Sequence, residues 1–133
     1  EFGGRGWPAR IDPAARAPRL KGDPQPAPRE ATTIAIVATD APLTKGEAKH
    51  MAVMAHDGLA RAIRPAHAPM DGDLVFAAST ARAGRAPDLR ARADLGQAAV
   101  DCLARAVARG VYEATALPFA GALPAWRDLF GGR

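Results

Sequence analysis

Residues 33–39 have the sequence TIAIVAT, a short run of β-branched and small apolar side chains that ends before Asp40 and Pro42. Apolar residues stand at consecutive positions, so both faces of an extended strand would be hydrophobic. Such a run is typical of an interior strand in a sheet that other layers cover on both sides. We therefore predict a buried strand over these residues.

A helix is predicted directly after this strand. Thr44 and Glu47 have the Thr-x-x-Glu spacing of a capping box, which marks the start of many helices. Small and apolar residues then recur every three or four positions, at Ala48, Met51, Ala55, Leu59 and Ala62. This period predicts an amphipathic helix of about five turns, which Pro65 ends.

The second half of the chain repeats this order. Residues 74–80, LVFAAST, predict a second interior strand, and residues 89–107 predict a helix that stops near Gly110. Cys102 lies on the apolar face of this helix, where we expect a small core residue. In the tail, residues 118–133, three side chains are candidates for packing anchors: Trp126, Leu129 and Phe130.

The order strand, helix, strand, helix predicts an α/β fold. Two strands alone cannot form a stable sheet that is buried on both faces. Since both predicted strands are apolar on both faces, their neighbours must come from another polypeptide. We therefore predict that the chain is one part of an α/β/α sandwich.

The N-terminal segment has a different composition. Residues 1–30 contain six of the twelve prolines and almost no aliphatic side chains, so we predict a linker or an arm on the surface. The sequence begins without an initiator methionine and without the basic and apolar regions of a signal peptide. We expect it to continue a longer chain.

Composition argues against several classes of protein. The 133 residues fit one domain, and 18 basic and 14 acidic side chains are interspersed to give a net charge of +4. Aromatic residues make up 5%, so the basic stripe and stacking side chains of a nucleic-acid binder are missing. A single cysteine excludes an intramolecular disulfide framework, and no apolar run approaches the roughly twenty residues of a membrane span. We expect a cytoplasmic protein that binds neither nucleic acid nor membrane and needs no cofactor.

Thr32 stands at the junction between the proline-rich arm and the first strand. A threonine at this point suits a nucleophile whose own α-amine acts as the base, once the preceding peptide bond is cut. The alternative is that Thr32 and Thr33 are ordinary β-forming residues that open a strand.

Asp71-Gly72-Asp73 comes immediately before the second strand. Two carboxylates separated by a glycine can point into one pocket, where they could orient an amine or share a proton. The alternative is a turn that leads into the strand. A Ca²⁺ loop fits less well, because the remaining oxygen ligands of the EF-hand spacing are absent.

Three histidines have no spacing that predicts a metal site. His50 and His56 are six residues apart, which puts them on different faces of the first helix, and His67 follows that helix. We expect all three to be ordinary surface or half-buried side chains.

Five stretches together carry a resemblance to a known family. They are TTIAIVATD, LTK, MAHDGLARAIRP, DGD and VFA, at residues 32–40, 43–45, 54–65, 71–73 and 75–77. With them the chain resembles the DmpA-type aminopeptidases and nylon-oligomer hydrolases, which are N-terminal-nucleophile-like hydrolases that share a fold with ornithine acetyltransferase. The resemblance covers residues 31–80 well and the second predicted helix loosely.

The resemblance implies a four-layer α/β/β/α sandwich, built by a precursor that cleaves itself into an α-chain and a β-chain. Residues 1–31 would hold the arm and the end of the α-region, and residues 32–133 would be the β-chain region. The implied function is hydrolysis of amide bonds in small peptides or aminohexanoate oligomers. The implied partners are the α-region of the same precursor and further αβ units in a homo-oligomer.

The resemblance also implies the catalytic residues. Thr32 maps to the nucleophile, and Asp71 and Asp73 map to its two partners, in the Asp-x-Asp form that is similar to the nylon-oligomer hydrolases. Relatives usually have Asn or Gly before the nucleophile, whereas this chain has Ala31. The oxyanion-stabilising Asn of relatives belongs to the α-chain. This sequence contains no Asn, so its oxyanion donor must lie outside these residues or be a backbone N–H.

Two other functions fit the same residues. One is acyl transfer to an amino acid, as in the ornithine acetyltransferase relatives. The other is a structural or binding role, in a member of the fold that no longer uses its site.

Overall fold

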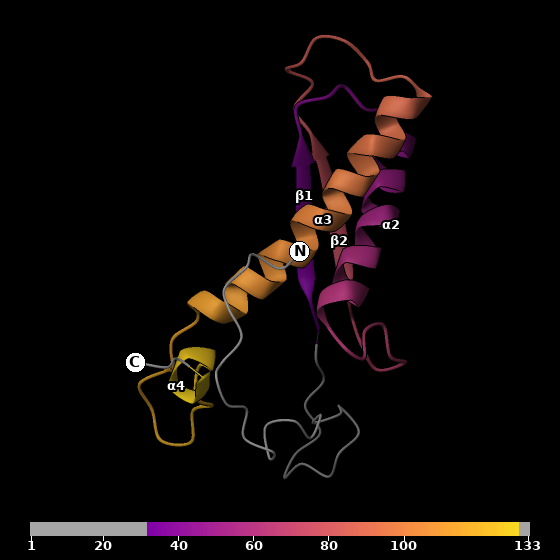
Figure 1. Cartoon of the computed structure of the whole chain (residues 1–133). Coiled ribbons are helices and arrows are strands. Elements are labelled where there is room, and N and C mark those ends of the chain that lie inside the picture. The colour runs from indigo at the N-terminus through magenta and orange to yellow at the C-terminus, as the bar shows by residue number, and fades with distance from the viewer. Residues whose placement is uncertain (1–31, 131–133) are drawn as a thin grey trace.

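The computed structural model describes residues 32–130, so the predicted arm lies outside the described residues. Two strands alternate with two long helices, and a short helix follows (Figure 1). The elements are β1 (Ile34–Thr39), α2 (Lys45–Ala62), β2 (Leu74–Ser79), α3 (Leu89–Glu113) and α4 (Trp126–Phe130). The predicted α/β class, both strands and the capping box of the first helix, at Thr44 and Glu47, are confirmed.

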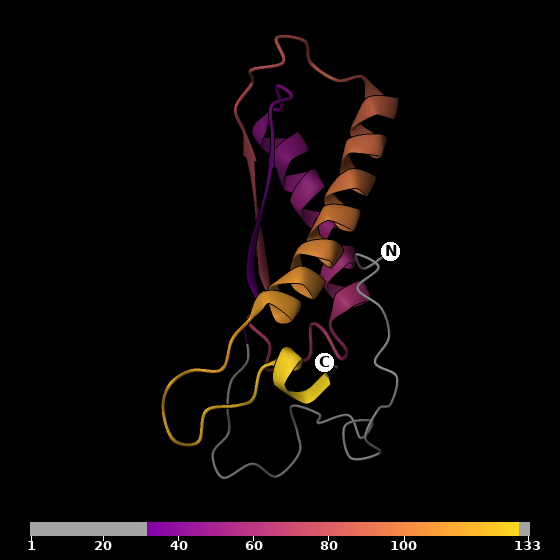
Figure 2. The ribbon, with the colours of Figure 1, turned by 60° about the vertical axis from the view of Figure 1, so that its left-hand side comes forward.

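β1 and β2 form a two-stranded parallel sheet, in register from Ile34 opposite Leu74 to Thr39 opposite Ser79. Parallel strands need a long crossover connection, and α2 provides it. Figure 2 shows the strands edge-on, with both long helices on the same side of the sheet. The described part of the chain therefore has two layers, one sheet and one pair of helices.

The core lies between the sheet and the two helices. Every second residue of each strand faces it, because side chains alternate along a strand. Its buried members are Val37, Met51, Ala52, Ala55, Leu59, Val75, Ala99 and Leu103. Three of its six helix members are alanines, so the helices can approach the sheet and each other closely.

The other face of the sheet is apolar and open. Ile34 is 71% exposed and Phe76 is 52% exposed, and Ile36 and Leu74 beside them are exposed as well. Within residues 32–130 nothing covers these side chains. That both faces are buried in a larger sandwich stays a prediction about the intact protein.

The two long helices are in close contact at Gly58 of α2. A Cβ atom at this position would lie 2.5 Å from the backbone oxygen of Val100 and 3.1 Å from the Cβ of Leu103 in α3. No real Cβ atom tolerates such a distance, so a glycine is required here. At this point the backbone of α2 packs directly against the backbone and the Cβ atoms of α3. Val100 and Leu103 of α3 are buried there.

The second helix is longer than the sequence predicted. It continues through Gly110 to Glu113, and the carbonyl of Gly110 accepts the N–H of Ala114. The added turn has tertiary contacts, since the ring of Tyr112 lies 5.3 Å from that of Trp126 in α4. These contacts outweigh the low helix propensity of one glycine.

Two expectations about single side chains were wrong. Cys102 is exposed rather than a small core residue, because it lies on the side of α3 that faces the open edge of β1. Of the three expected packing anchors in the tail, Trp126 and Phe130 have ring centroids 5.6 Å apart. Leu129 is 58% exposed and is therefore not an anchor. The helix α4 that carries them was not predicted.

No helix within residues 32–130 has the length and apolar character needed to cross a bilayer.

Gly58→Ala should lower the free energy of unfolding by about 1–3 kcal/mol, because the added methyl group overlaps the backbone of α3. Gly110→Ala is the matched control. Nothing lies within 4 Å of a Cβ at Gly110, so this variant should gain roughly 0.5–1 kcal/mol from higher helix propensity. Denaturant unfolding of the intact protein measures both. Equal stability of the Gly58→Ala variant and the wild type would contradict the close helix contact.

Lowering the pH should remove the contribution of Glu47 to stability. Hydrogen bonds from the backbone and hydroxyl of Thr44, with Arg92 nearby, hold the pKa of Glu47 below its ordinary value of 4.5. A carboxylate whose pKa is lowered by folding stabilises the native state above its ordinary pKa, and this is lost as pH falls through the lowered value. Glu47→Gln should therefore melt below the wild type near neutral pH, and the difference should shrink in acid.

Asp94→Asn is the control for this pH series. Asp94 forms an exposed ion pair with Arg90 four residues away on the same helix. Such pairs contribute little. A melting difference for Glu47→Gln that stays constant from neutral to acid pH would contradict the interpretation.

Candidate functional site

Thr32 and Asp71-Gly72-Asp73 lie at the same end of the sheet. Each precedes a strand, and the two strands are parallel and in register. If the register continues by two residues beyond Ile34, Thr33 stands opposite Asp73 and Thr32 opposite Gly72. The backbone supports this pairing, because the N–H of Leu74 donates to the carbonyl of Thr33 at 2.9 Å. Two segments about forty positions apart in the sequence therefore become neighbours.

The side chain of Thr32 rests on Gly72. A Cβ atom at Gly72 would lie 2.7 Å from Oγ1 and 3.3 Å from Cγ2 of Thr32. The glycine between the two carboxylates thus leaves the space that the threonine hydroxyl occupies. Thr32 itself is exposed, so a molecule in solution can reach it.

Asp73 ties the start of β1 to the loop after α2. Its side chain is 2% exposed. Oδ1 accepts the N–H of Thr33 at 3.0 Å, and Oδ2 accepts the N–H of His67 at 3.2 Å. Because a buried carboxylate is costly without hydrogen-bond donors, these contacts fix both segments relative to Asp73.

Asp71 holds the turn that precedes β2. Its Oδ2 accepts the N–H of Ala68 at 2.9 Å, and its own N–H donates to the carbonyl of Ala68 at 2.8 Å. The turn itself lies at Pro69 and Met70, just before the segment for which the alternative placed it. From this turn Gly72 and Asp73 reach the start of β1, so the turn and a site at residues 71–73 do not exclude each other.

Two of the three histidines join this end of the molecule. The Nδ1 atom of His67 lies 3.1 Å from Oδ2 of Asp73, and the rings of His56 and His67 meet edge to face with centroids 4.9 Å apart. The exposure of both fits the expected surface or half-buried side chains, but their grouping with Asp73 was missed. The signal was weak: a histidine six residues before Asp73, in the loop that must return to the sheet edge.

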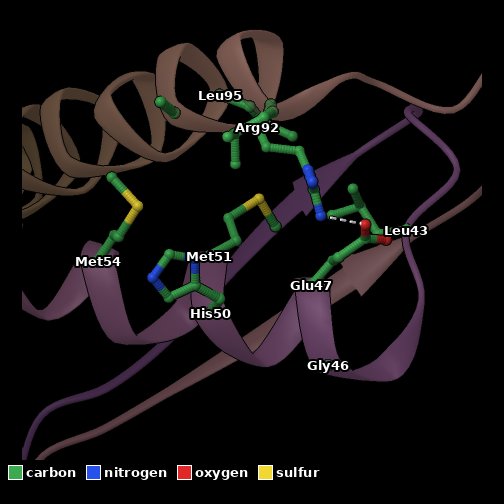
Figure 3. A pocket seen from close by; sticks show the side chains of 10 residues that line it. Leu43, Gly46, Glu47, His50, Met51, Met54, Arg92 and Leu95 are labelled. Atoms are coloured by element: carbon green, nitrogen blue, oxygen red, sulfur yellow. Dashed lines mark hydrogen bonds and ion pairs between the residues drawn. The ribbon is translucent and has the colours of Figure 1, made fainter.

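A groove of about 560 Å³ lies elsewhere, between the first turns of α2 and α3 (Figure 3). It is lined mainly by apolar side chains such as Met51, Met54 and Leu95, and Glu47 and Arg92 pair with each other at its rim. Since α2 begins after the carboxyl end of β1, this groove and Thr32 are at opposite ends of the sheet.

No cluster of three or more potential metal ligands occurs among residues 32–130.

Comparison with known proteins adds a family to this geometry. The family model described as Peptidase family S58 matches residues 2–122. Over 111 residues the chain is 46% identical to proteins from Mycobacterium bovis and Mycobacterium tuberculosis, and 40% identical to one from Mycobacterium leprae. Each of these relatives is named an uncharacterized aminopeptidase. The matches cover 76% of this chain but 30–31% of the relatives, so the chain spans about a third of their length.

Gly72→Ala should move the side chain of Thr32 while changing stability little. The new methyl carbon would stand 2.7 Å from Oγ1, and the exposed threonine can turn away. A crystal structure of the variant, with its melting temperature, checks this. Gly46→Ala is the control, because a Cβ there meets nothing within 4 Å. An unchanged position of Oγ1 in the Gly72→Ala variant would contradict the contact.

Proposed function

The chain belongs to peptidase family S58, and from this membership we propose that it is the catalytic part of a self-processing amidase or aminopeptidase with Thr32 as nucleophile. One observation carries the proposal: the hydroxyl of Thr32 lies against Gly72. In the sequence this glycine stands between Asp71 and Asp73. An exposed hydroxyl at the start of a strand, against a glycine that two acidic residues flank in the sequence, is an arrangement suited to acyl transfer chemistry.

Cleavage of the bond between Ala31 and Thr32 is the first step of this proposal. Before cleavage the nitrogen of Thr32 is part of an amide and cannot act as a base. Afterwards it is an α-amine, whose ordinary pKa near 8 suits general base catalysis at neutral pH. Processing therefore supplies the base on the same residue that carries the nucleophile.

The hydrolytic cycle then has two halves. The Thr32 hydroxyl attacks the carbonyl carbon of the substrate amide, its proton passes to the α-amine, and the amine product leaves with that proton. Water next attacks the acyl-enzyme, which releases the acid and restores the hydroxyl. The proposed role of Asp73 is electrostatic, because a carboxylate bound to the N–H of Thr33 stands near the ammonium that forms in each half.

The remainder of the protein is proposed to complete this site. By strand alternation Thr32 has the parity of Ile34 and Ile36, whose side chains lie on the open apolar face. A layer that covers this face would also border Thr32, and we assign that layer to the α-region of the same precursor. The α-region would then supply the oxyanion donor, which is absent from this sequence as an Asn.

The proposed substrates are small peptides and linear aminohexanoate oligomers, and the proposed assembly is a homo-oligomer of αβ units. The aminopeptidase names of the mycobacterial relatives support the first substrate class. The Asp-x-Asp pattern at Asp71 and Asp73 supports the second, through its similarity to the nylon-oligomer hydrolases.

Thr32→Ala should abolish both self-cleavage and amide hydrolysis in the full-length protein, since it removes the attacking oxygen. Mass spectrometry should find two fragments in the wild type, the smaller one beginning at Thr32, and a single uncut chain in the variant. Thr32→Ser keeps a hydroxyl and should retain part of both activities. Thr33→Ala is the control, because the backbone N–H that binds Asp73 remains. Activity of Thr32→Ala at the wild-type rate would exclude Thr32 as nucleophile.

Analysis of the reaction products separates hydrolysis from the two rival functions, acyl transfer and a binding role. Incubation of a fixed acyl donor with and without an added amino acid shows whether the acyl group passes to water or to the amine. A dominant N-acyl amino acid product would favour the acetyltransferase-type reaction. No turnover of amino-acid amides, short peptides or aminohexanoate oligomers by processed protein would favour a binding role.

A further inference from the structure

His67 lies beside Asp73 without having been assigned a role. Its side chain is 38% exposed, and its Nδ1 atom lies 3.1 Å from the nearly buried Oδ2 of Asp73. Its backbone N–H donates to the same oxygen. One residue therefore makes two contacts with one carboxylate oxygen, while Oδ1 of Asp73 accepts the N–H of Thr33.

The contact with Asp73 bears on which ring nitrogen of His67 carries a proton. An ionised carboxylate can only accept hydrogen bonds, so the Nδ1 atom of His67 must carry a proton to bind Asp73. In the neutral ring Nε2 is then the acceptor, and the 3.1 Å contact with Asp73 favours this tautomer. The edge-to-face contact with His56 of α2 restricts how the ring can turn.

The backbone of His67 is also set for this contact. Its φ angle is 58°, in the left-handed region that non-glycine residues seldom adopt. A side chain held in this conformation usually has a compensating interaction. Here the backbone N–H and the ring both reach Asp73, so the turn and the carboxylate support each other.

We propose that His67 is a positioning residue that acts on the nucleophile through Asp73. The path runs from the ring of His67 to Oδ2 of Asp73, and from Oδ1 to the N–H of Thr33, next to Thr32. His67 keeps the carboxylate from rotating and so keeps the start of β1 in place. This inference rests on the proposed function, since it assumes that Thr32 does the chemistry.

Two substitutions at position 67 isolate the ring. His67→Gly accepts the left-handed backbone and keeps the N–H that binds Asp73, but it removes the ring. His67→Asn tolerates the same backbone, and its amide nitrogen is attached to Cγ, as Nδ1 is in histidine. Asn can therefore return a donor to nearly the same place.

Kinetics of the processed full-length protein test the proposal. His67→Gly should lower kcat about 10- to 100-fold, the range expected for losing one polar contact with a charged group, with KM little changed. His67→Asn should recover most of the loss. In a double-mutant cycle, the combination of His67→Gly and Asp73→Asn should be scarcely slower than Asp73→Asn alone. His50→Ala, in the distant groove, should have the wild-type kcat.

Wild-type kcat in His67→Gly would overturn the inference, and so would a loss that Asn does not rescue and that adds fully to Asp73→Asn. The proposed function fails separately: if Thr32→Ala stays active, it falls whatever His67 does. If Thr32→Ala is inactive while His67→Gly is normal, the inference alone falls.

A spectroscopic measurement keeps the test independent of whether His67→Gly folds. Two-bond proton–nitrogen NMR of the wild-type protein, at about pH 8 where an ordinary imidazole is neutral, reports which ring nitrogen of His67 carries the proton. The proposal requires a proton on Nδ1. A neutral His67 with its proton on Nε2 would overturn it.

Discussion

β1 and β2 run parallel and in register, and this pairing constrains everything else in the described chain. A parallel pair forces the chain to cross from one end of the sheet to the other between the strands, which α2 does. It also brings the starts of both strands to the same end. Thr32 and Asp71-Gly72-Asp73 become neighbours for this reason, and the bond from the N–H of Thr33 to Asp73 then holds the two segments together.

Asp73 turns this neighbourhood into a defined geometry. Its carboxylate is nearly buried and is bound by the N–H groups of Thr33 and His67. Because leaving a buried carboxylate without donors is costly, the strand start and the loop cannot separate without a penalty. Gly72 completes the arrangement by leaving room for the Thr32 side chain. In the proposed enzyme, Asp73 thus has both a structural and an electrostatic role.

The sheet is finished on one face only. Close packing at Gly58 brings the two helices together over the inner face, whereas Ile34, Ile36 and Phe76 are exposed on the outer one. Apolar side chains adjacent on two strands rarely stay exposed in a native protein. The chain spans about a third of its mycobacterial relatives, which is consistent with further layers elsewhere in the proposed precursor.

The sequence by itself determined the order of the two strands and the two long helices, the start of α2 at its capping box and the residues proposed for the site. These depend on local periodicity, on capping chemistry and on a motif resemblance, all of which are written in consecutive residues. Only the tertiary structure decided that α3 runs past Gly110, that Cys102 is exposed and that His67 reaches Asp73. The length of α3 depends on the contact of Tyr112 with Trp126, and the exposure of Cys102 depends on the groove beside β1. The position of His67 depends on the return of the loop after α2 to the sheet edge. Periodicity carries no information about such contacts, because they are fixed by packing between elements and not by neighbours along the chain.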